Sequence, residues 1–349
     1  MSHQVTVLPS GHRFAVEDGH TVLDAALQAG VMLPYSCKNG ACSSCKGRLV
    51  EGRVELGPHQ AQTLTPEEAR RGLTLFCVAR PLTDLTIEAR EVAGIADIPV
   101  KKLPCRVRSL TRAAPDVQIV RLQLPATEKQ LRFNAGQYIE IILKDGRRRS
   151  YSLANAPHEE DGLELHIRHL PGGAFTDQVF GAGPAPLKER DILRFEGPFG
   201  SFFLREDSDK PIVMVASGTG FAPIRSIVEH MAFKDIRRPV TLYWGGRRPR
   251  DLYLDELARG WAASRPDFRY VPVVSDALPE DGWSGRTGFV HHAVLEDFAD
   301  LSGHQVYACG APVVVDSARR DFVGQRGLPA DEFYADSFTS EADSARATV

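Results

Sequence analysis

Four cysteines are the residues whose type and spacing most clearly indicate chemistry. Three of them form a C-x4-C-x2-C segment and the fourth follows downstream, the set being Cys37, Cys42, Cys45 and Cys77. Thiolates at this spacing can ligate the irons of a [2Fe–2S] cluster. We therefore expect a cluster-binding loop near the N-terminus, with these four residues as metal ligands.

The residues between the cysteines suit such a loop. Gly40 and Gly47 are expected to supply the backbone freedom for a segment that folds back on itself. The small residues Ala41, Ser43 and Ser44 leave backbone N–H groups able to point at sulfur, and such hydrogen bonds help to set a cluster's potential.

Two other uses of the cysteines remain open. Structural zinc sites usually combine two C-x2-C pairs, and this chain has one such pair. A disulfide framework needs an oxidising compartment, whereas the N-terminus does not resemble a signal peptide. Cys105 and Cys309 are the remaining cysteines, and Cys105 is expected to be buried in a strand.

Length and composition narrow the class of protein. The 349 residues predict two or three domains, and the net charge of −3 argues against a nucleic-acid partner. No apolar run reaches the length of a membrane span, so we expect a cytoplasmic protein without a membrane partner. We also expect a monomer. Residues 100–205 carry 17 Lys and Arg against 12 Asp and Glu, and this basic excess indicates either an anionic ligand or an ordinary solvated surface.

The pattern of residues changes twice along the chain and predicts a multidomain protein. Residues 1–93 read as an α+β domain, with a hairpin at 3–8 and 12–16, a helix capped by Thr21, a strand at 46–54, a second helix opened by Thr65-Pro66, and a strand that ends at Cys77. A link follows at about 93–104. Residues 103–205 show short alternating strands, such as 117–124, 138–143 and 163–168, and predict an antiparallel β-barrel.

From residue 206 to 338 strands and helices alternate, which predicts an α/β doubly wound parallel sheet. The expected strands are 212–216, 240–244, 268–274 and 305–309, and the expected helices are 222–233, 252–263 and 288–298. Residues 339–349 are small and polar, and we expect a disordered tail. The histidines show no metal-ligand spacing, the pair His291-His292 is expected on a helix surface, and the three tryptophans are expected to be packing residues.

Five short motifs accompany these two domains. They are Arg149-Ser150-Tyr151-Ser152, His166-Ile167-Arg168 leading into Gly172-Gly173-Ala174-Phe175-Thr176, Gly197-Pro198-Phe199-Gly200-Ser201, Gly218-Thr219-Gly220, and Cys309-Gly310-Ala311-Pro312. Glycines at the start of a helix or in a strand-to-helix turn leave N–H groups that can hold phosphate. In this order the motifs resemble the ferredoxin–NADP reductase superfamily over residues 103–338.

The N-terminal stretch resembles the plant-type ferredoxin domain, a β-grasp fold. The whole chain is similar to the fused reductases of bacterial oxygenases and to the iron–sulfur reductase of the CDP-6-deoxy-3,4-glucoseen pathway. This resemblance implies FAD as the flavin, with Arg149 on the pyrophosphate, Tyr151 against the isoalloxazine and Ser152 near N5. It further implies cofactor contacts from a larger set, namely Ser150, His166, Arg168, Gly172, Gly173, Ala174 and Thr176.

For the nicotinamide nucleotide, the resemblance implies that Gly218, Thr219 and Gly220 hold the pyrophosphate and that Cys309 and Gly310 approach the ring. It also implies that Phe338 stacks over the flavin as a gate. The catalytic set is therefore expected to be Tyr151, Ser152, Cys309 and Phe338. NADH is the expected substrate because the run from Tyr243 to Arg247 resembles NADH-using relatives, although Arg247 could accept the 2′-phosphate of NADPH.

The function implied is an NAD(P)H-dependent oxidoreductase in which hydride passes to FAD. Single electrons then pass through the [2Fe–2S] cluster to an electron-accepting protein, either an oxygenase or a sugar dehydratase. Two alternatives stay open. One is a free-standing flavin or ferric reductase with an auxiliary ferredoxin domain, and the other is a non-enzymatic iron–sulfur module.

Overall fold

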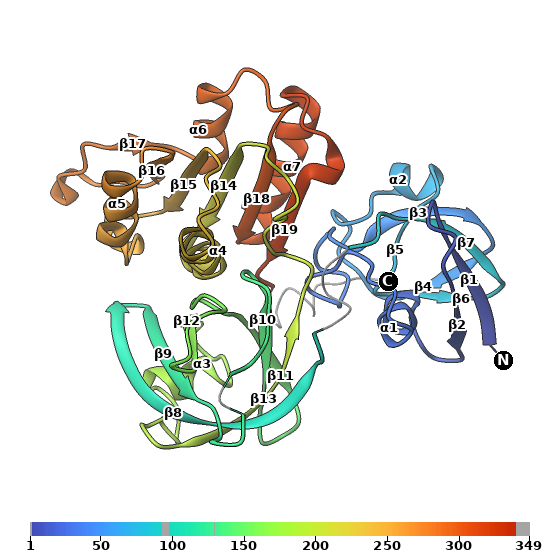
Figure 1. The fold of residues 1–349 in the computed structure, drawn as a ribbon, viewed down its shortest axis with the longest axis horizontal. Coiled ribbons are helices and arrows are strands. Elements are labelled where there is room, and N and C mark those ends of the chain that lie inside the picture. The colour runs from blue at the N-terminus through green and yellow to red at the C-terminus, as the bar shows by residue number, and fades with distance from the viewer. Residues whose placement is uncertain (1, 93–97, 129, 340–349) are drawn as a thin grey trace. The chain divides into compact units, whose positions relative to one another are not determined.

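The computed structural model describes residues 2–92, 98–128 and 130–339, which form two compact units (Figure 1). Of the described residues, the first unit contains 2–92, the short segment Gly200–Phe202 and 335–339. The second contains 98–199 and 203–334. Most of the expected link at 93–97 and the expected tail at 340–349 lie outside the described residues.

The first unit is built on a five-stranded sheet in the order β2-β1-β7-β3-β5. Strands β1 and β7 run parallel, while the other neighbouring strands in this sheet are antiparallel. Strands β4 and β6 form a separate antiparallel pair. The bounds are β1 Ser2–Leu8, β2 Arg13–Glu17, α1 Val22–Gln28, β3 Lys46–Glu51, β4 Val54–Leu56, α2 Pro66–Arg70, β5 Leu73–Leu75, β6 Ala79–Pro81 and β7 Leu85–Glu88.

Local sequence explains these elements. Alternation in β1 buries Val5 and Val7 on one face, as the predicted hairpin required. The Thr21 hydroxyl accepts a hydrogen bond from the backbone N–H of Asp24 at 3.1 Å and so caps α1. Helix α2 begins after Thr65 with Pro66 in its first turn, as the sequence predicted, and the side chains of Thr65 and Glu68 form a complete capping box.

Two predictions for this unit were wrong in detail. The expected strand at 46–54 is divided into β3 and β4, because the chain turns at Gly52, whose φ is +97°. Cys77 was expected at the end of a strand, but β5 ends at Leu75 and Cys77 lies in the turn before β6. The fourth thiol is therefore presented by a turn.

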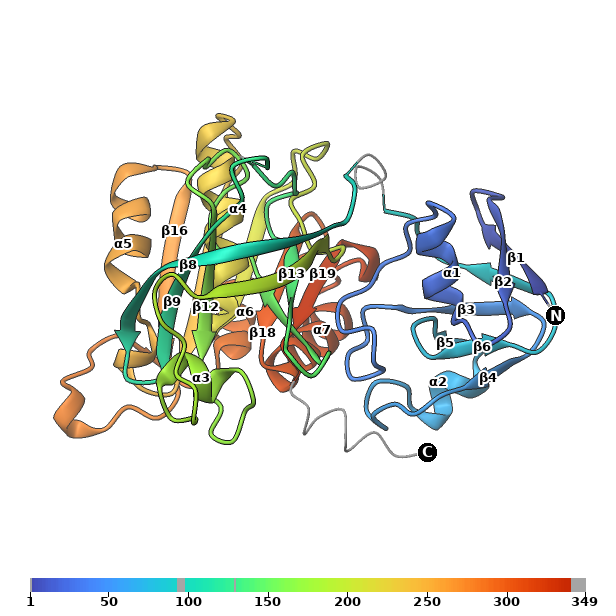
Figure 2. The same cartoon turned by 90° about the horizontal axis from the view of Figure 1, so that it is seen from below.

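The second unit begins with a six-stranded antiparallel sheet in the order β11-β10-β13-β8-β9-β12. The long strand β8 pairs with both β13 and β9 (Figure 2). A bridge between Leu153 and Leu165 joins the two ends of this order, which closes the sheet into the expected barrel. The bounds are β8 Lys101–Ala114, β9 Val117–Gln123, β10 Tyr138–Ile142, β11 Arg148–Ser152, β12 Leu163–Arg168, α3 Thr176–Phe180 and β13 Ile192–Phe199.

The same unit contains a second six-stranded sheet, in the order β17-β16-β15-β14-β18-β19; of its last strand, β19, only Phe333 and Tyr334 are assigned to this unit. Its pairs from β17 to β18 are parallel, as the strand–helix alternation predicted. Helices α4 and α5 cover one face, and α6 and α7 cover the other (Figure 1). The bounds are β14 Ile212–Ser217, α4 Phe221–Phe233, β15 Val240–Gly246, α5 Asp255–Ser264, β16 Phe268–Val274, β17 Arg286–Thr287, α6 Val290–Asp297, β18 Gln305–Gly310, α7 Pro312–Gln325 and β19 Phe333–Ser337.

The order of this sheet places a topological switch beside β14. Strand β15 lies on one side of β14 and the late strand β18 lies on the other. Ligands bind doubly wound sheets at the carboxyl ends of strands next to such a switch. A short 3-10 turn, Gly218–Gly220, follows β14 at this point. No helix among the described residues is long and apolar enough to cross a membrane.

Candidate functional site

The first unit brings the four predicted cluster ligands together. Cys45 and Cys77 have their sulfurs 3.1 Å apart, and the thiol of Cys37 is hydrogen-bonded to those of Cys42 and Cys77. All four are free thiols; Cys42, Cys45 and Cys77 are buried, and Cys37 is partly exposed. Soft sulfur ligands converging on one point suit an iron–sulfur cluster, so the donor set fits the predicted [2Fe–2S] group.

The electrostatics of the loop explain why thiolates there need a cationic partner. The pKa of Cys37 is raised to about 11, because the hydrogen bond from Cys42 lowers it less than the bond with Cys77 and burial raise it. For Cys42 the bond with Cys37 and burial raise the pKa well above its usual value. Backbone N–H groups of Asn39 and Ser44 donate to these two sulfurs and act in the opposite direction. Bound iron would supply the charge that four ionised sulfurs require.

The two glycines of the loop serve different purposes. Gly40 has a φ of +72° and provides the expected turn. A side chain is also excluded there, because a Cβ would lie 2.8 Å from the Cβ of His59. Gly47 lies within β3 at an ordinary backbone angle, and the expectation of a turn there was wrong. A Cβ on Gly47 would lie 2.3 Å from the ring of Phe76, so glycine is needed for close packing.

In the barrel, β11 carries the Arg149-Ser150-Tyr151-Ser152 motif. The neighbouring Arg148 is held by Glu140 and Glu196 at 2.8 and 2.7 Å, so its charge is already paired. Tyr151 packs against Phe175 with ring centroids 5.7 Å apart, and burial raises the pKa of its hydroxyl. The flavin roles of Arg149, Tyr151 and Ser152 stay predictions.

The glycine loop before α3 is closed by its own hydrogen bonds. The N–H of Gly172 donates to the Asp177 carboxylate at 3.2 Å, and the N–H of Gly173 donates to the carbonyl of Leu170 at 2.8 Å. The Thr176 hydroxyl donates to the same Leu170 carbonyl at 2.8 Å. A phosphate bound here would have to replace these bonds, so the assignment of Gly172, Gly173, Ala174 and Thr176 stays a prediction.

At the topological switch, the turn after β14 meets the end of β18. A Cβ on Gly220 would lie 2.3 Å from the carbonyl oxygen of Cys309, and one on Gly310 would lie 2.3 Å from the Ser217 hydroxyl. The Cys309 thiol donates to the Gly220 carbonyl at 2.7 Å. The two segments that were expected to bind the nicotinamide nucleotide therefore lie in direct backbone contact, which only glycines permit.

Trp244 combines packing with a polar contact. Its ring is fully buried and stacks on Phe221 at 3.9 Å, as a packing residue would. Its indole N–H also donates to the carbonyl of Gly218 at 3.0 Å, which fixes the first residue of the turn. Arg168 reaches the same residue, with Nη1 2.6 Å from the place that a Cβ of Gly218 would take.

A buried polar network that the sequence analysis missed links the barrel to this turn. The Glu164 carboxylate binds Arg121 at 2.9 Å, the imidazole of His166 at 2.9 Å, and the guanidinium of Arg225 from α4. Tyr253 bonds the other ring nitrogen of His166 at 2.8 Å. The sequence signal for this network was the alternation in β12, where the polar residues Glu164, His166 and Arg168 occupy one face of the strand and apolar residues the other.

The protonation states in this network follow from burial and charge. Burial opposes ionisation of Glu164, but His166, Arg225 and Arg121 outweigh it and lower the pKa of that carboxyl to about 2. Burial also lowers the pKa of His166, against the opposing effect of Glu164, so the imidazole is neutral at pH 7. Since Nε2–H faces the carboxylate, Nδ1 is the acceptor and the Tyr253 hydroxyl donates. Both nitrogens of His166 are thus used by protein groups.

Phe338 follows β19 and is partly buried. Its predicted contact with a flavin stays a prediction, as does the approach of Cys309 to a nicotinamide ring. Cys105 is buried in β8 within the barrel core, as expected, and burial raises the pKa of its thiol to about 12.

The fold and the two sites define a class of protein: an iron–sulfur domain joined to a barrel and a doubly wound nucleotide domain. Family models match three stretches of the chain. They are a 2Fe-2S iron-sulfur cluster binding domain over residues 5–82, an oxidoreductase FAD-binding domain over 104–204 and an oxidoreductase NAD-binding domain over 214–320.

Relatives with known names align over almost the whole chain. The CDP-6-deoxy-L-threo-D-glycero-4-hexulose-3-dehydrase reductase of Yersinia pseudotuberculosis is 41% identical over 97% of this chain and 99% of its own. The reductase component 1 of terephthalate 1,2-dioxygenase from Comamonas is 40% identical over 97% and 98%. The crystal structure of the Amycolatopsis cytochrome P450 reductase GcoB superposes with a TM-score of 0.75 at 36% identity, covering 97% and 99% of the two chains.

The chain therefore belongs to the family of flavin- and nicotinamide-dependent reductases that carry an N-terminal [2Fe–2S] ferredoxin domain. It is an NAD(P)H-dependent oxidoreductase with FAD and a [2Fe–2S] cluster as its cofactors, as the resemblance implied.

The ligand assignment predicts a clear difference between buried cysteines. Replacing Cys77 by Ser should abolish the [2Fe–2S] signal in electron paramagnetic resonance of the dithionite-reduced protein, and Cys37→Ser, Cys42→Ser and Cys45→Ser should do the same. Cys105→Ser is the matched control, a buried thiol in the other unit, and should keep the full signal. Loss of the cluster in Cys105→Ser, or its retention in Cys77→Ser, would contradict the assignment.

The Tyr253–His166 bond predicts a measurable coupling. Tyr253→Phe leaves the buried Nδ1 of His166 without its donor, which should lower the free energy of unfolding by about 1–3 kcal/mol. In a double-mutant cycle with His166→Gln, the two effects should be non-additive by about 0.5–3 kcal/mol. Tyr334→Phe, which removes the hydrogen bond from a different tyrosine to Glu332 near β19, should add to Tyr253→Phe independently. Full additivity of Tyr253→Phe and His166→Gln would show that the two residues are not coupled.

Proposed function

We propose that this protein carries electrons from NADH to a separate protein acceptor, either the terminal component of an oxygenase or a sugar dehydratase. The observation that carries the proposal is that four converging thiols and a doubly wound nucleotide sheet occur in one chain. The names of the relatives, a dehydrase reductase and dioxygenase reductase components, support these two classes of acceptor.

Bound FAD would accept a hydride and release single electrons, and a bound [2Fe–2S] cluster would take them one at a time. The residues of the chain position these groups. The Gly218–Gly220 turn, held by Trp244, is proposed to bind the nucleotide pyrophosphate, and Arg149 and Tyr151 are proposed to bind the flavin. The four cysteines are proposed to bind the cluster.

The test is a reconstitution of the holoprotein with candidate acceptors under anaerobic conditions. NADH oxidation coupled to a terminal oxygenase or to a CDP-sugar dehydrase should occur with wild-type protein and be abolished in Cys77→Ser. Ferricyanide reduction should persist in Cys77→Ser, because a small acceptor can take electrons directly from the flavin. Equal reduction of all protein acceptors by wild-type and Cys77→Ser would instead support a free-standing flavin reductase.

We propose that the working form is a cytoplasmic monomer. All six cysteines are free thiols, which suits a reducing compartment. Sedimentation of the holoprotein would test the oligomeric state.

We further propose that NADH is preferred over NADPH. The guanidinium of Arg248 is held by both oxygens of Asp281, at 2.7 and 2.8 Å, so it is not available to a 2′-phosphate. The Asp251 carboxylate accepts hydrogen bonds from the backbone N–H groups of Arg247 and Arg248 at 2.8 and 3.0 Å. This places a negative charge at the strand end where a 2′-phosphate would bind.

The nucleotide preference predicts different effects from the two arginines. Steady-state kcat/KM should be higher with NADH than with NADPH. Whatever NADPH activity exists should fall in Arg247→Ala and change little in Arg248→Ala, because Arg248 is already paired. Asp281→Asn weakens that pairing and should raise kcat/KM for NADPH without a matching gain for NADH. A wild-type preference for NADPH, or equal losses in the two arginine variants, would contradict this account.

A further inference from the structure

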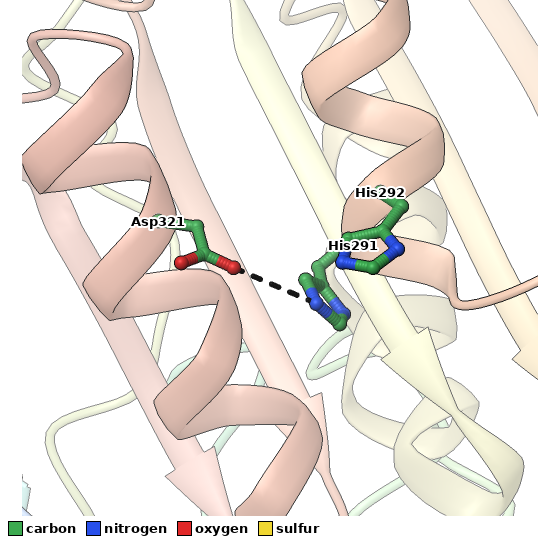
Figure 3. Close-up of side chains that lie close together, drawn as sticks. All are labelled: His291, His292 and Asp321. Carbon is green, nitrogen blue, oxygen red and sulfur yellow. Dashed lines mark ion pairs between the residues drawn. The ribbon is translucent and has the colours of Figure 1, made fainter.

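Helices α6 and α7 bring together three side chains that lie outside the electron-transfer site. They are His291 and His292 from the first turn of α6 and Asp321 from α7 (Figure 3). One ligand atom from each lies within 4.8 Å of the others. Both histidines were expected on a helix surface, and for His291 this was wrong, because that residue is only 8% exposed.

The geometry resembles that of a metal site before ion binding. The Nε2 of His291 lies 3.6 Å from an oxygen of Asp321. Two ligands about 2.0–2.2 Å from a tetrahedral ion are separated by roughly 3.3–3.6 Å, so this pair is already close to the spacing that an ion needs. His292 is exposed and gives an ion a route of entry from solvent.

The chemical state of the three groups also suits metal binding. The nitrogen of His291 that faces Asp321 is Nε2, while Nδ1 is buried without a hydrogen-bond partner among the described residues. A neutral imidazole can ligate an ion through one ring nitrogen. The Asp321 carboxylate also accepts bonds from Arg320 at 2.9 and 3.1 Å and from Gln325 at 3.1 Å. Such bonds orient a ligating carboxylate and leave further lone pairs on its oxygens.

We propose that His291, His292 and Asp321 form a binding site for a divalent transition-metal ion of the zinc class. Two imidazoles and one carboxylate favour Zn²⁺ over Mg²⁺ or Ca²⁺, which prefer oxygen ligands. An ion bound there would join α6 to α7 and leave a coordination position for water. It would also fix the first turn of α6, where Val290 lies against Gly245 at the end of β15.

The experiment uses the holoprotein with its cluster intact, titrated with Zn²⁺ and, separately, with Mg²⁺ by isothermal calorimetry. Wild-type protein should bind one Zn²⁺ per chain and no Mg²⁺, and Zn²⁺ should raise its thermal unfolding temperature. His292→Gln changes an exposed residue and should preserve the fold, yet weaken Zn²⁺ binding by at least about tenfold. Asp321→Asn should weaken it similarly.

His12→Gln provides the matched control. His12 forms a 2.7 Å pair with Glu91 in the other unit, and no third metal ligand joins this pair among the described residues. This variant should bind Zn²⁺ as wild-type protein does. Absence of Zn²⁺ binding by wild-type protein would overturn the proposal. Equal affinity in wild-type protein and His292→Gln would also overturn it, because the ion would then be held elsewhere in the chain.

Discussion

The buried carboxylate of Glu164 is the interaction on which the second unit most depends. A carboxylate with 5% of its side chain exposed is costly to ionise unless it is paired. Glu164 is paired three times, by two arginines and a neutral histidine, and one of the arginines belongs to α4. The charge of Glu164 therefore holds the barrel strand β12 and helix α4 together. Its burial depends on pairing groups from both parts of the second unit.

The turn that is proposed to bind the nucleotide rests on this network through aromatic contacts. Tyr253 donates to His166 and meets the rings of Trp244 and Phe221 edge-on, at 5.3 and 6.2 Å. Trp244 in turn holds the carbonyl of Gly218. A rigid packed path thus runs from a barrel strand to the end of β14. Positioning residues of this kind keep a binding turn in one geometry.

Much of this organisation could be predicted from the sequence, and the exceptions have physical causes. Cysteine spacing, strand alternation and the Gly218–Gly220 turn are local signals, and they led to the three folds and to four thiols that do converge. Helix α7 was not predicted, and Asp321 lies on it, so the cluster with His291 could not be recognised. The partners of Glu164 and His166 also lie far away in sequence, in α4 and before α5. Local patterns indicate which residues are unusual, whereas tertiary packing decides what they contact.

The glycines at the switch point show how the fold itself constrains chemistry. Side chains at Gly220 or Gly310 would collide with the backbone of the other segment, so two strand ends can meet here only without them. The same lack of side chains leaves bare backbone at the carboxyl edge of the sheet, where doubly wound folds bind nucleotides. Glycine at these two positions therefore serves both the close packing of β14 against β18 and the access of a nucleotide to the sheet edge. Cys309 also suits this close contact, because its small thiol bonds the Gly220 carbonyl where a larger side chain would separate the strands.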